Sequence, residues 1–599
     1  MRWAMIIMRM TVGRGLERYM ERTVEGNVGK WARVRWQVIG VCLGAICLVA
    51  ACSPAVQLLI PSETPAAAVT LSPSPSSTLP AVTPSQALTP EMMPTVSSLT
   101  TAPVPTSSTP DVTEAPRSSP LPSLSSSSLA STSIPVTTPA PSTSSPSPVH
   151  TLTLPATTAP VATTAPVATT APVATTAPVA PAVWEQSITL NTYGWQDALV
   201  STTPDDEIYP YPRLDFDAVS GPTPRVYRAV YLQNQYVQLV VLPELGGRIL
   251  RWTDLSTGRQ LFYANPVIKP TRWGFRGWWL ATGGMEWAFP EEEHGLNEYR
   301  PWQYRLIGNG VQVWDTDERT GLLVQVTIQL DDMHSYFTLS PRISNPSAET
   351  AAYQFWANAM LTLSDANAPS SALSFVLPGD AVTVHSSADG SLPGPGGRMA
   401  WPLYNGRDFS RYETWQQYLG VFANPAAAGF VGAYDSQSDQ GIVRIFPHQV
   451  AQGVKIFCLG DLPASLWTDD GSRYFELWGG LTPTFWDYRT LEPGGSVAWT
   501  ERWYPVSGIG AYNWANEVAA IRLAPMGDRA EIAVATSRAL EGQVVLRRGG
   551  VEVQRWSRSL PKPIAPGQPF VGRSEATEVG GAWGVQVLEN GQIVAQMGP

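Results

Sequence analysis

Cysteine is scarce in this chain of 599 residues: there are four, and three of them, Cys42, Cys47 and Cys52, lie close together near the N-terminus. If the segment that precedes Cys52 is a removable leader and Cys52 is itself modified, Cys458 is the one thiol left, and no intramolecular disulfide can form. An exported domain of this size does not require one. Cys458 lies in the apolar motif KIFCLG, and we expect it to be a small buried hydrophobe.

Charged residues are also few. Asp, Glu, Lys and Arg make up 15% of the chain, and the formal net charge is −10. Nucleic acid is therefore not an expected partner, because its binding needs a basic surface that displaces counterions. The chain also lacks a P-loop, a dinucleotide-binding glycine fingerprint, a G-x-S-x-G motif and the Cys/His spacing of a metal site. We expect no cofactor and no metal.

The first 51 residues have the composition of a targeting segment. Basic residues up to Arg35 precede an apolar run from Trp36 to Ala51, which is short for a membrane-spanning helix but suits a signal peptide. The run ends Val-Ala-Ala-Cys, which resembles a bacterial lipobox. We interpret residues 1–51 as a lipoprotein signal peptide and expect Cys52 to carry the lipid that anchors the protein to the cell membrane, on its extracytoplasmic face. An ordinary signal peptide, or an N-terminal anchor with an incidental cysteine, is the alternative.

Residues 52–183 are rich in Ser, Thr, Pro and Ala and contain four copies of the hexapeptide ATTAPV, from Ala156 to Val179. Such a tract cannot bury enough apolar surface to offset the entropy lost on ordering. We predict a disordered linker that works as a stalk.

From residue 184 to about 510, short alternating apolar and polar runs are separated by Gly, Pro, Asp and Asn turns, with almost no helical periodicity. This pattern predicts an all-β fold, a large antiparallel β-sandwich. Residues 517–599 contain further strand candidates and a good hairpin turn at Asn590-Gly591, and we predict a small β-sandwich accessory module there.

Four motifs occur in a specific order: LPELGGRI from Leu242, GGMEWAFP from Gly283, GVKIFCLG from Gly453 and YFELWGG from Tyr474. Together they resemble a bacterial family of unknown function in the galactose-mutarotase-like superfamily. The resemblance covers roughly residues 184–505 and implies the supersandwich fold of that superfamily.

Aldose mutarotases use a glutamate to take the proton of the anomeric hydroxyl and a histidine to protonate the ring oxygen, since opening a cyclic sugar needs a base and an acid. The resemblance places Glu476 at the position of the glutamate; the alternative is an outward-pointing, solvated carboxylate on a strand. The strand that would carry the histidine reads YQFWANAML, with Asn358 near that place. An amide can orient a sugar hydroxyl, so Asn358 is a candidate sugar-binding residue, but it cannot donate a catalytic proton. His294 is the remaining candidate acid, and Glu286 is a second carboxylate.

Other polar and aromatic residues are candidates for contacts with a sugar. Arg248 can donate a fork of hydrogen bonds to hydroxyls or brace the turn beside it. Flat indoles suit the apolar faces of sugar rings, and Trp279, Trp287 and Trp478 are candidates, although most tryptophans of a large sandwich belong to its core. The acidic run from Glu291 to Glu293 is expected to be a solvated loop, with a catalytic or Ca²⁺ site as the alternative. The remaining histidines, His334, His385 and His448, have no supporting motif and are expected to be surface or turn residues.

These observations predict a cell-surface lipoprotein whose mutarotase-like domain binds carbohydrate without catalysis or with weak catalysis. The alternative is a carbohydrate-active enzyme, an epimerase or a glycoside-processing enzyme that uses Glu476 with His294 and Glu286. A purely structural stalked surface protein is a third possibility, and it predicts no concave aromatic pocket. We expect Glu286, His294 and Glu476 to line one cleft.

Overall fold

The computed structural model describes residues 180–423, 426–557 and 564–599. The predicted signal peptide, the lipidation site at Cys52 and the predicted linker up to residue 179 lie outside these residues. The first described strand, β1 (Ala182–Gly194), begins two residues before the boundary expected from the sequence. No helix in the described ranges has the length and apolar character needed to cross a membrane.

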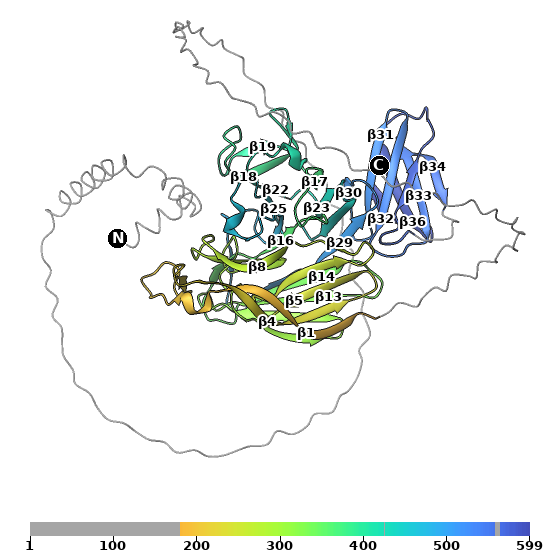
Figure 1. The fold of residues 1–599 in the computed structure, drawn as a ribbon. Helices are drawn as coiled ribbons and strands as arrows, with labels where there is room; N and C mark the ends of the chain where they lie inside the picture. The colour runs from red at the N-terminus through yellow and green to blue at the C-terminus, as the bar shows by residue number, and fades with distance from the viewer. Residues whose placement is uncertain (1–179, 424–425, 558–563) are drawn as a thin grey trace, which may run out of the picture. The chain divides into compact units, whose positions relative to one another are not determined.

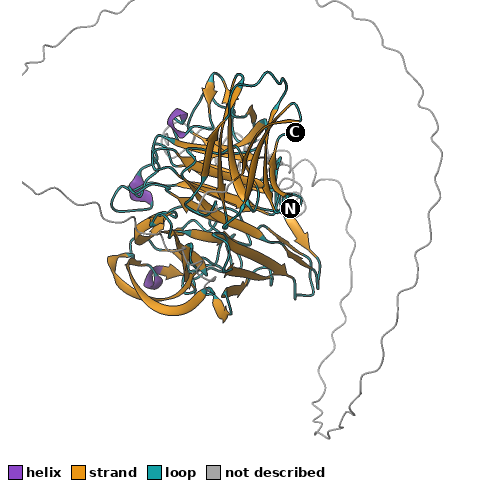
Figure 2. Cartoon of the chain, turned by 90° about the vertical axis from the view of Figure 1, so that its right-hand side faces the viewer, coloured by secondary structure: helices purple, strands orange, loops and turns teal. Residues whose placement is uncertain are grey.

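Strands dominate the described part of the chain (Figure 2). Its only helical segments are three short 3-10 turns: η1 (Gln196–Ala198), η2 (Tyr412–Thr414) and η3 (Ala464–Leu466). The all-β fold class predicted from the alternating pattern is confirmed.

The largest sheet has 14 strands, and every pairing in it is antiparallel except that of β1 with β8. Its strands, in spatial order, are β19 (Arg398–Ala400), β18 (Ala381–Ser387), β22 (Leu419–Ala423), β25 (Gly453–Cys458), β26 (Phe475–Gly480), β16 (Trp356–Leu361), β10 (Met285–Ala288), β6 (Arg248–Asp254), β5 (Val237–Leu242), β4 (Ser220–Gln233), β1, β8 (Ala264–Thr271) and β9 (Trp279–Gly283), with β7 (Arg259–Gln260) beside β6.

A second sheet of nine strands packs against the first. Its order is β11 (Gln303–Ile307), β12 (Gly310–Thr316), β13 (Leu323–Leu330), β14 (Phe337–Ser344), β29 (Glu501–Ser507), β24 (Gln440–Ile445), β23 (Phe430–Asp435) and β17 (Leu373–Val376), with β28 (Ser496–Ala498) beside β14.

Alternation along the strands builds the core between the two sheets. On β13, Val324, Val326 and Ile328 are buried while the residues between them are only half-buried. The buried set joins one cluster with Val421 and Leu477 of the large sheet. This is the sandwich that period-2 patterning predicts, with one face of each sheet turned inward.

The C-terminal module consists of two four-stranded sheets. One is β30 (Trp514–Ala515), β31 (Ala519–Met526), β32 (Arg529–Thr536) and β35 (Phe570–Arg573); the other is β34 (Val551–Ser557), β33 (Gly542–Arg548), β36 (Trp583–Glu589) and β37 (Gln592–Met597) (Figure 1). The two share an apolar core of their own. The last hairpin turns at Asn590 and Gly591, both with positive φ, as a two-residue turn requires.

Three strand pairs stand outside these sheets: β2 (Leu199–Val200) with β3 (Arg213–Leu214), β15 (Ala351–Tyr353) with β27 (Arg489–Leu491), and β20 (Leu403–Tyr404) with β21 (Arg407–Asp408).

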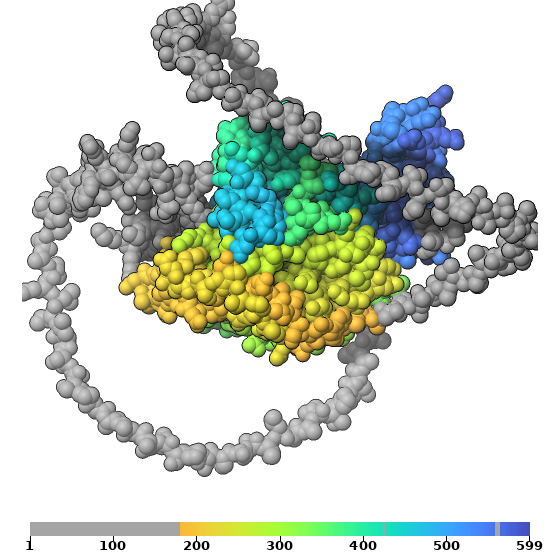
Figure 3. Space-filling view, viewed as in Figure 1, coloured from red at the N-terminus to blue at the C-terminus, as the bar shows by residue number. Residues whose placement is uncertain are grey.

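The central strands of the large sheet are buried on both faces. All residues of β10, β16, β25 and β26 are buried, although the second sheet covers only one side of them. The segment around η3 covers part of the other side, since Trp467 clusters with Met360 of β16 and Phe457 of β25. The ion pair of Lys269 with Asp469, at 2.7 Å, joins this segment to β8. In Figure 3 the light-blue part of the chain lies against the yellow part. Residues that point to this second side are therefore enclosed without belonging to the sandwich core, which is where a ligand site can form.

Candidate functional site

The register of four central strands places polar side chains in one row. Asn358 on β16 lies opposite Glu286 on β10, Trp478 on β26 lies opposite Asn358, and Lys455 on β25 lies opposite Trp478. Directly opposed residues in a sheet point to the same face. The residues between them, such as Trp287 and Leu477, point to the sandwich core. The row therefore lies on the enclosed second side of the sheet.

A pocket opens on this side, with a space of about 530 Å3 that includes its open mouth. Among its lining residues are ionisable side chains from distant parts of the chain: His294, Lys455 and Glu476. Aromatic and aliphatic side chains form most of the remaining wall: Trp273, Trp279, Phe457, Leu459, Leu462, Leu466, Trp467, Tyr474 and Trp478. A concave apolar wall with a few convergent polar groups is the usual form of a small-molecule site.

His294 is held in place from behind by Glu286. The Nδ1 atom of His294 lies 2.6 Å from Oε1 of Glu286, and the imidazole stacks on the indole of Trp279 with ring centroids 3.7 Å apart. Because an ionised carboxylate only accepts, Nδ1 is the donor in this bond. The ring orientation is thereby fixed, and Nε2 is the nitrogen left for chemistry in the pocket.

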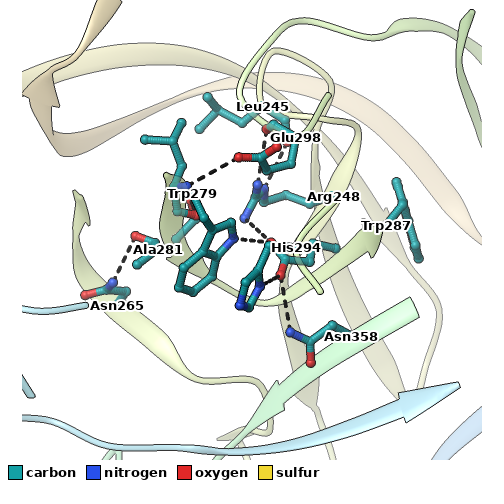
Figure 4. Close-up of polar contacts among 12 residues, drawn as sticks. Leu245, Arg248, Asn265, Trp279, Ala281, Trp287, His294, Glu298 and Asn358 are labelled. Carbon is teal, nitrogen blue, oxygen red and sulfur yellow. Dashed lines mark hydrogen bonds and ion pairs between the residues drawn. The ribbon is translucent and has the colours of Figure 1, made fainter. Parts of the chain in front are cut away.

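Glu286 accepts three further hydrogen bonds, and it is 1% exposed. Nε1 of Trp279 donates to it at 3.0 Å, Nδ2 of Asn358 at 3.2 Å, and Nη1 of Arg248 at 3.3 Å (Figure 4). Burial acts to raise the pKa of Glu286, but the charge and hydrogen bond of His294, with the charge of Arg248 and the bond from Trp279, outweigh it and hold this pKa below its ordinary value. Glu286 is thus a buried, ionised carboxylate that accepts from Nδ1 of His294.

Glu476 is the acidic group within the pocket wall that is most enclosed. Nε1 of Trp478 donates to its Oε2 at 2.7 Å. Burial raises the pKa of Glu476, and the charges of Lys455 and His294 reduce that shift without cancelling it. A carboxyl with a raised pKa, in one pocket with an oriented histidine, is an arrangement suited to general acid–base catalysis.

Comparison with known families gives one match, over residues 204–506, to the family described as Domain of unknown function (DUF5107). The chain belongs to this family. The resemblance drawn from the ordered motifs is confirmed, and the matched range contains every residue of the pocket.

The DUF5107 domain is also similar to several solved structures. A TPR-domain containing protein from Parabacteroides distasonis is 22% identical, with 58% of each chain covered and a TM-score of 0.49, so the match spans little more than half of that protein. A putative mutarotase (YeaD) from Salmonella typhimurium is 12% identical, with 52% of this chain and 98% of that one covered and a TM-score of 0.35. A putative aldose 1-epimerase from Escherichia coli K12 is 15% identical, with 46% and 98% covered and a TM-score of 0.35.

The DUF5107 domain brings Glu286, His294 and Glu476 together, but in two layers. His294 and Glu476 line the pocket, as do Trp279 and Trp478, whereas Glu286 lies behind His294 and does not reach the wall. The reason is the stacked pair of His294 and Trp279, which stands between the carboxylate and the open space.

Three residues expected to touch a sugar are placed elsewhere. Arg248 is fully buried, and it donates to the carbonyls of Leu245 and Glu298 at 3.0 and 3.2 Å, so it braces the turn. Asn358 is fully buried outside the pocket lining, and its Nδ2 donates to Glu286. Trp287 lies apart from this network (Figure 4), since it follows Glu286 on a strand and must point to the core.

Two functional candidates were missed from the sequence. Lys455 is the one charged residue in the otherwise apolar strand β25, and that isolation was a usable signal. His385, expected to be an ordinary surface or turn residue, lines the pocket; burial and the charge of Lys455 put its pKa well below the ordinary value. Of the other two, His334 pairs with Asp331 in a turn and His448 contacts Gln449.

No group of three or more His, Cys, Asp and Glu side chains in the described ranges is arranged to hold a metal ion. The expectation that the acidic run is a solvated loop is wrong for two of its residues. Glu291 and Glu292 are buried and accept from the hydroxyl of Tyr488.

Proposed function

We propose that the pocket of this mutarotase-like domain binds a sugar and that His294 and Glu476 open and close its ring, so that the two anomers interconvert. The observation that carries the proposal is that a histidine oriented through Nδ1 and a glutamate with a raised pKa line the same pocket. The indoles of Trp279 and Trp478 and the ring of Tyr474 supply flat apolar surfaces for the sugar.

Each group has a defined part in this chemistry. Glu476 accepts the proton of the anomeric hydroxyl, while Nε2 of the protonated His294 donates to the ring oxygen, and the bond between that oxygen and the anomeric carbon breaks. The open-chain aldehyde turns about its first carbon–carbon bond, and the reverse steps close the ring on the other face. Glu286 positions His294 and stabilises its positive charge.

Binding without turnover is the second candidate, and Asn358 favours it. The resemblance to mutarotases implies a histidine near this strand position, but the amide of Asn358 cannot donate a catalytic proton. The domain then acts as a sugar-capturing module that has kept the pocket.

Polarimetry of freshly dissolved α-anomers of glucose, galactose and mannose distinguishes the two candidates. We expect the wild type to accelerate anomerisation of at least one sugar, and Glu476→Gln or His294→Asn to lower that rate by about 100- to 10,000-fold while the fold survives. Glu413→Gln, at an exposed position on η2, is the matched control and should retain the wild-type rate. Binding seen by calorimetry without acceleration of any sugar would support the second candidate.

We further propose that the protein is a lipoprotein of the cell surface, anchored through Cys52 and carried on the stalk of residues 52–183. The support is the basic leader, the apolar run and the Val-Ala-Ala-Cys motif. Cys52→Ala should move the protein from the membrane fraction to the soluble fraction or leave it unprocessed. An unchanged mass and membrane association would contradict lipidation at this residue.

A further inference from the structure

Lys455 is a buried cation that faces the pocket and has no partner for its charge. Its side chain is 3% exposed and lines the pocket wall. Its ammonium lies over the faces of three aromatic rings: Phe485 at 4.4 Å, Trp478 at 4.6 Å and Phe457 at 5.0 Å. Within the part of the chain that the structure describes, this ammonium makes no hydrogen bond and no ion pair.

The surrounding contacts explain why the charge stays unpaired. Glu476 and Glu293 are close enough to act on it electrostatically, but neither carboxylate lies within ion-pair distance, and Glu476 is turned toward the N–H of Trp478. A buried ammonium without a hydrogen-bonded partner is costly. Aromatic faces offset part of that cost. Because the ammonium lines the pocket and makes no hydrogen bond, it can donate to a ligand there.

We propose that Lys455 recognises a carboxylate on the bound sugar, so that the pocket takes a uronic acid in preference to the neutral sugar of the same configuration. This inference rests on the proposed function of the pocket as a sugar site. No carboxylate of the described residues pairs with Lys455, so a carboxylate on the ligand can supply that partner. It would form a charge-assisted hydrogen bond, which is strong in an enclosed pocket.

The charge balance of the wall favours a monoanion over a phosphate. Lys455 is opposed in the same pocket by Glu293 and Glu476, and His294 is already paired with Glu286 through Nδ1. A dianionic phosphate would meet two carboxylates with one uncommitted cation, whereas a carboxylate matches the single charge of Lys455. The recognition is therefore expected to be selective for a carboxylate.

Matched ligand pairs test this inference. Calorimetry or ligand-observed NMR would compare glucose with glucuronate and galactose with galacturonate, and would include glucose 6-phosphate as the phosphate probe. We expect the wild type to bind one uronate about 10- to 100-fold more tightly than its neutral partner, the range for a hydrogen bond to a charged group. Lys455→Met should reduce that ratio to about one.

A second variant guards against a folding defect. Lys455→Gln keeps a hydrogen-bond donor without the charge, and it should also lose the preference; thermal unfolding would verify the fold of both variants. A uronate preference that survives in both folded variants overturns the inference, as does tighter binding of glucose 6-phosphate than of either uronate. Binding of neutral sugars with no uronate preference overturns it and leaves the proposed function standing. If no sugar of either kind binds, the proposed function itself fails.

Discussion

Two buried carboxylates of this domain, Glu501 and Glu476, both lie near a cation and tryptophan indoles, but they differ in how many hydrogen bonds they accept. Glu501 lies in the sandwich core and accepts four hydrogen bonds: two from Arg444 at 2.7 and 2.8 Å, and one each from the indoles of Trp499 at 2.9 Å and Trp503 at 3.3 Å. Glu476, on the pocket side of the large sheet, accepts one, from Trp478.

The cations of the two sites also differ, because one is paired with its carboxylate and the other is not. The guanidinium of Arg444 is forked onto Glu501, and Gly479 makes room for it, since a Cβ there would lie 2.2 Å from the guanidinium carbon. The ammonium of Lys455 is not paired with Glu476 but is held over aromatic rings. The first site is closed and satisfied, as a structural ion pair must be. In the second site, Lys455 and Glu476 line the pocket without pairing with each other. A ligand can therefore supply the hydrogen-bond partners that they lack.

The comparison predicts stability effects of opposite sign, and the larger concerns the closed pair. Arg444→Met leaves Glu501 as an uncompensated buried charge, so we expect it to lower the free energy of unfolding by about 3–5 kcal/mol. Chemical denaturation followed by tryptophan fluorescence would measure this.

The control for that prediction is the double variant Arg444→Met/Glu501→Gln. It removes both charges and keeps one oxygen, which can accept from either Trp499 or Trp503, so it should recover part of the loss. If Arg444→Met alone were as stable as the wild type, the description of this pair as a satisfied structural element would be wrong.

The smaller effect concerns the open site. Burial lowers the pKa of Lys455 to about 8, from an ordinary 10.5, with Glu476 and Glu293 opposing the shift. Between these pH values the unfolded chain holds a proton that the folded chain has released, so wild-type stability should rise with pH. Lys455→Met should raise the free energy of unfolding by about 1–3 kcal/mol at pH 7 and abolish this rise between pH 8 and 10.

Arg251→Met is the matched control, because Arg251 is an exposed cation on β6 and its loss should change stability by less than about 0.5 kcal/mol. Unfolding curves at pH 7 and pH 10 for the three proteins give the measurement. A destabilised Lys455→Met would mean that the aromatic contacts of Lys455 support the fold, and the contrast between a closed and an open charged site would be lost.

The sequence by itself determined the features that depend on neighbours along the chain. Alternation predicted the all-β class, and the ordered motifs predicted the family. Period-2 geometry also dictates that Glu476 and Trp478 share a face, and that Trp287 points away from Glu286, because successive side chains of a strand point to opposite sides. Trp287 could therefore have been assigned to the core from the motif GGMEWAFP alone.

The tertiary structure decided which strands face one another and which side of the sheet stays open. Asn358 and Trp478 are paired across more than a hundred residues of chain, and Lys455 joins them through the register of β25 with β26. The contact of His294 with Glu286 spans only eight residues of chain, but the place of His294 in one pocket with Glu476 depends on packing between distant segments. Side-chain alternation is local and repeats every two residues, whereas register is fixed by packing between distant segments. The composition of the pocket, Lys455 and His385 included, follows from that packing.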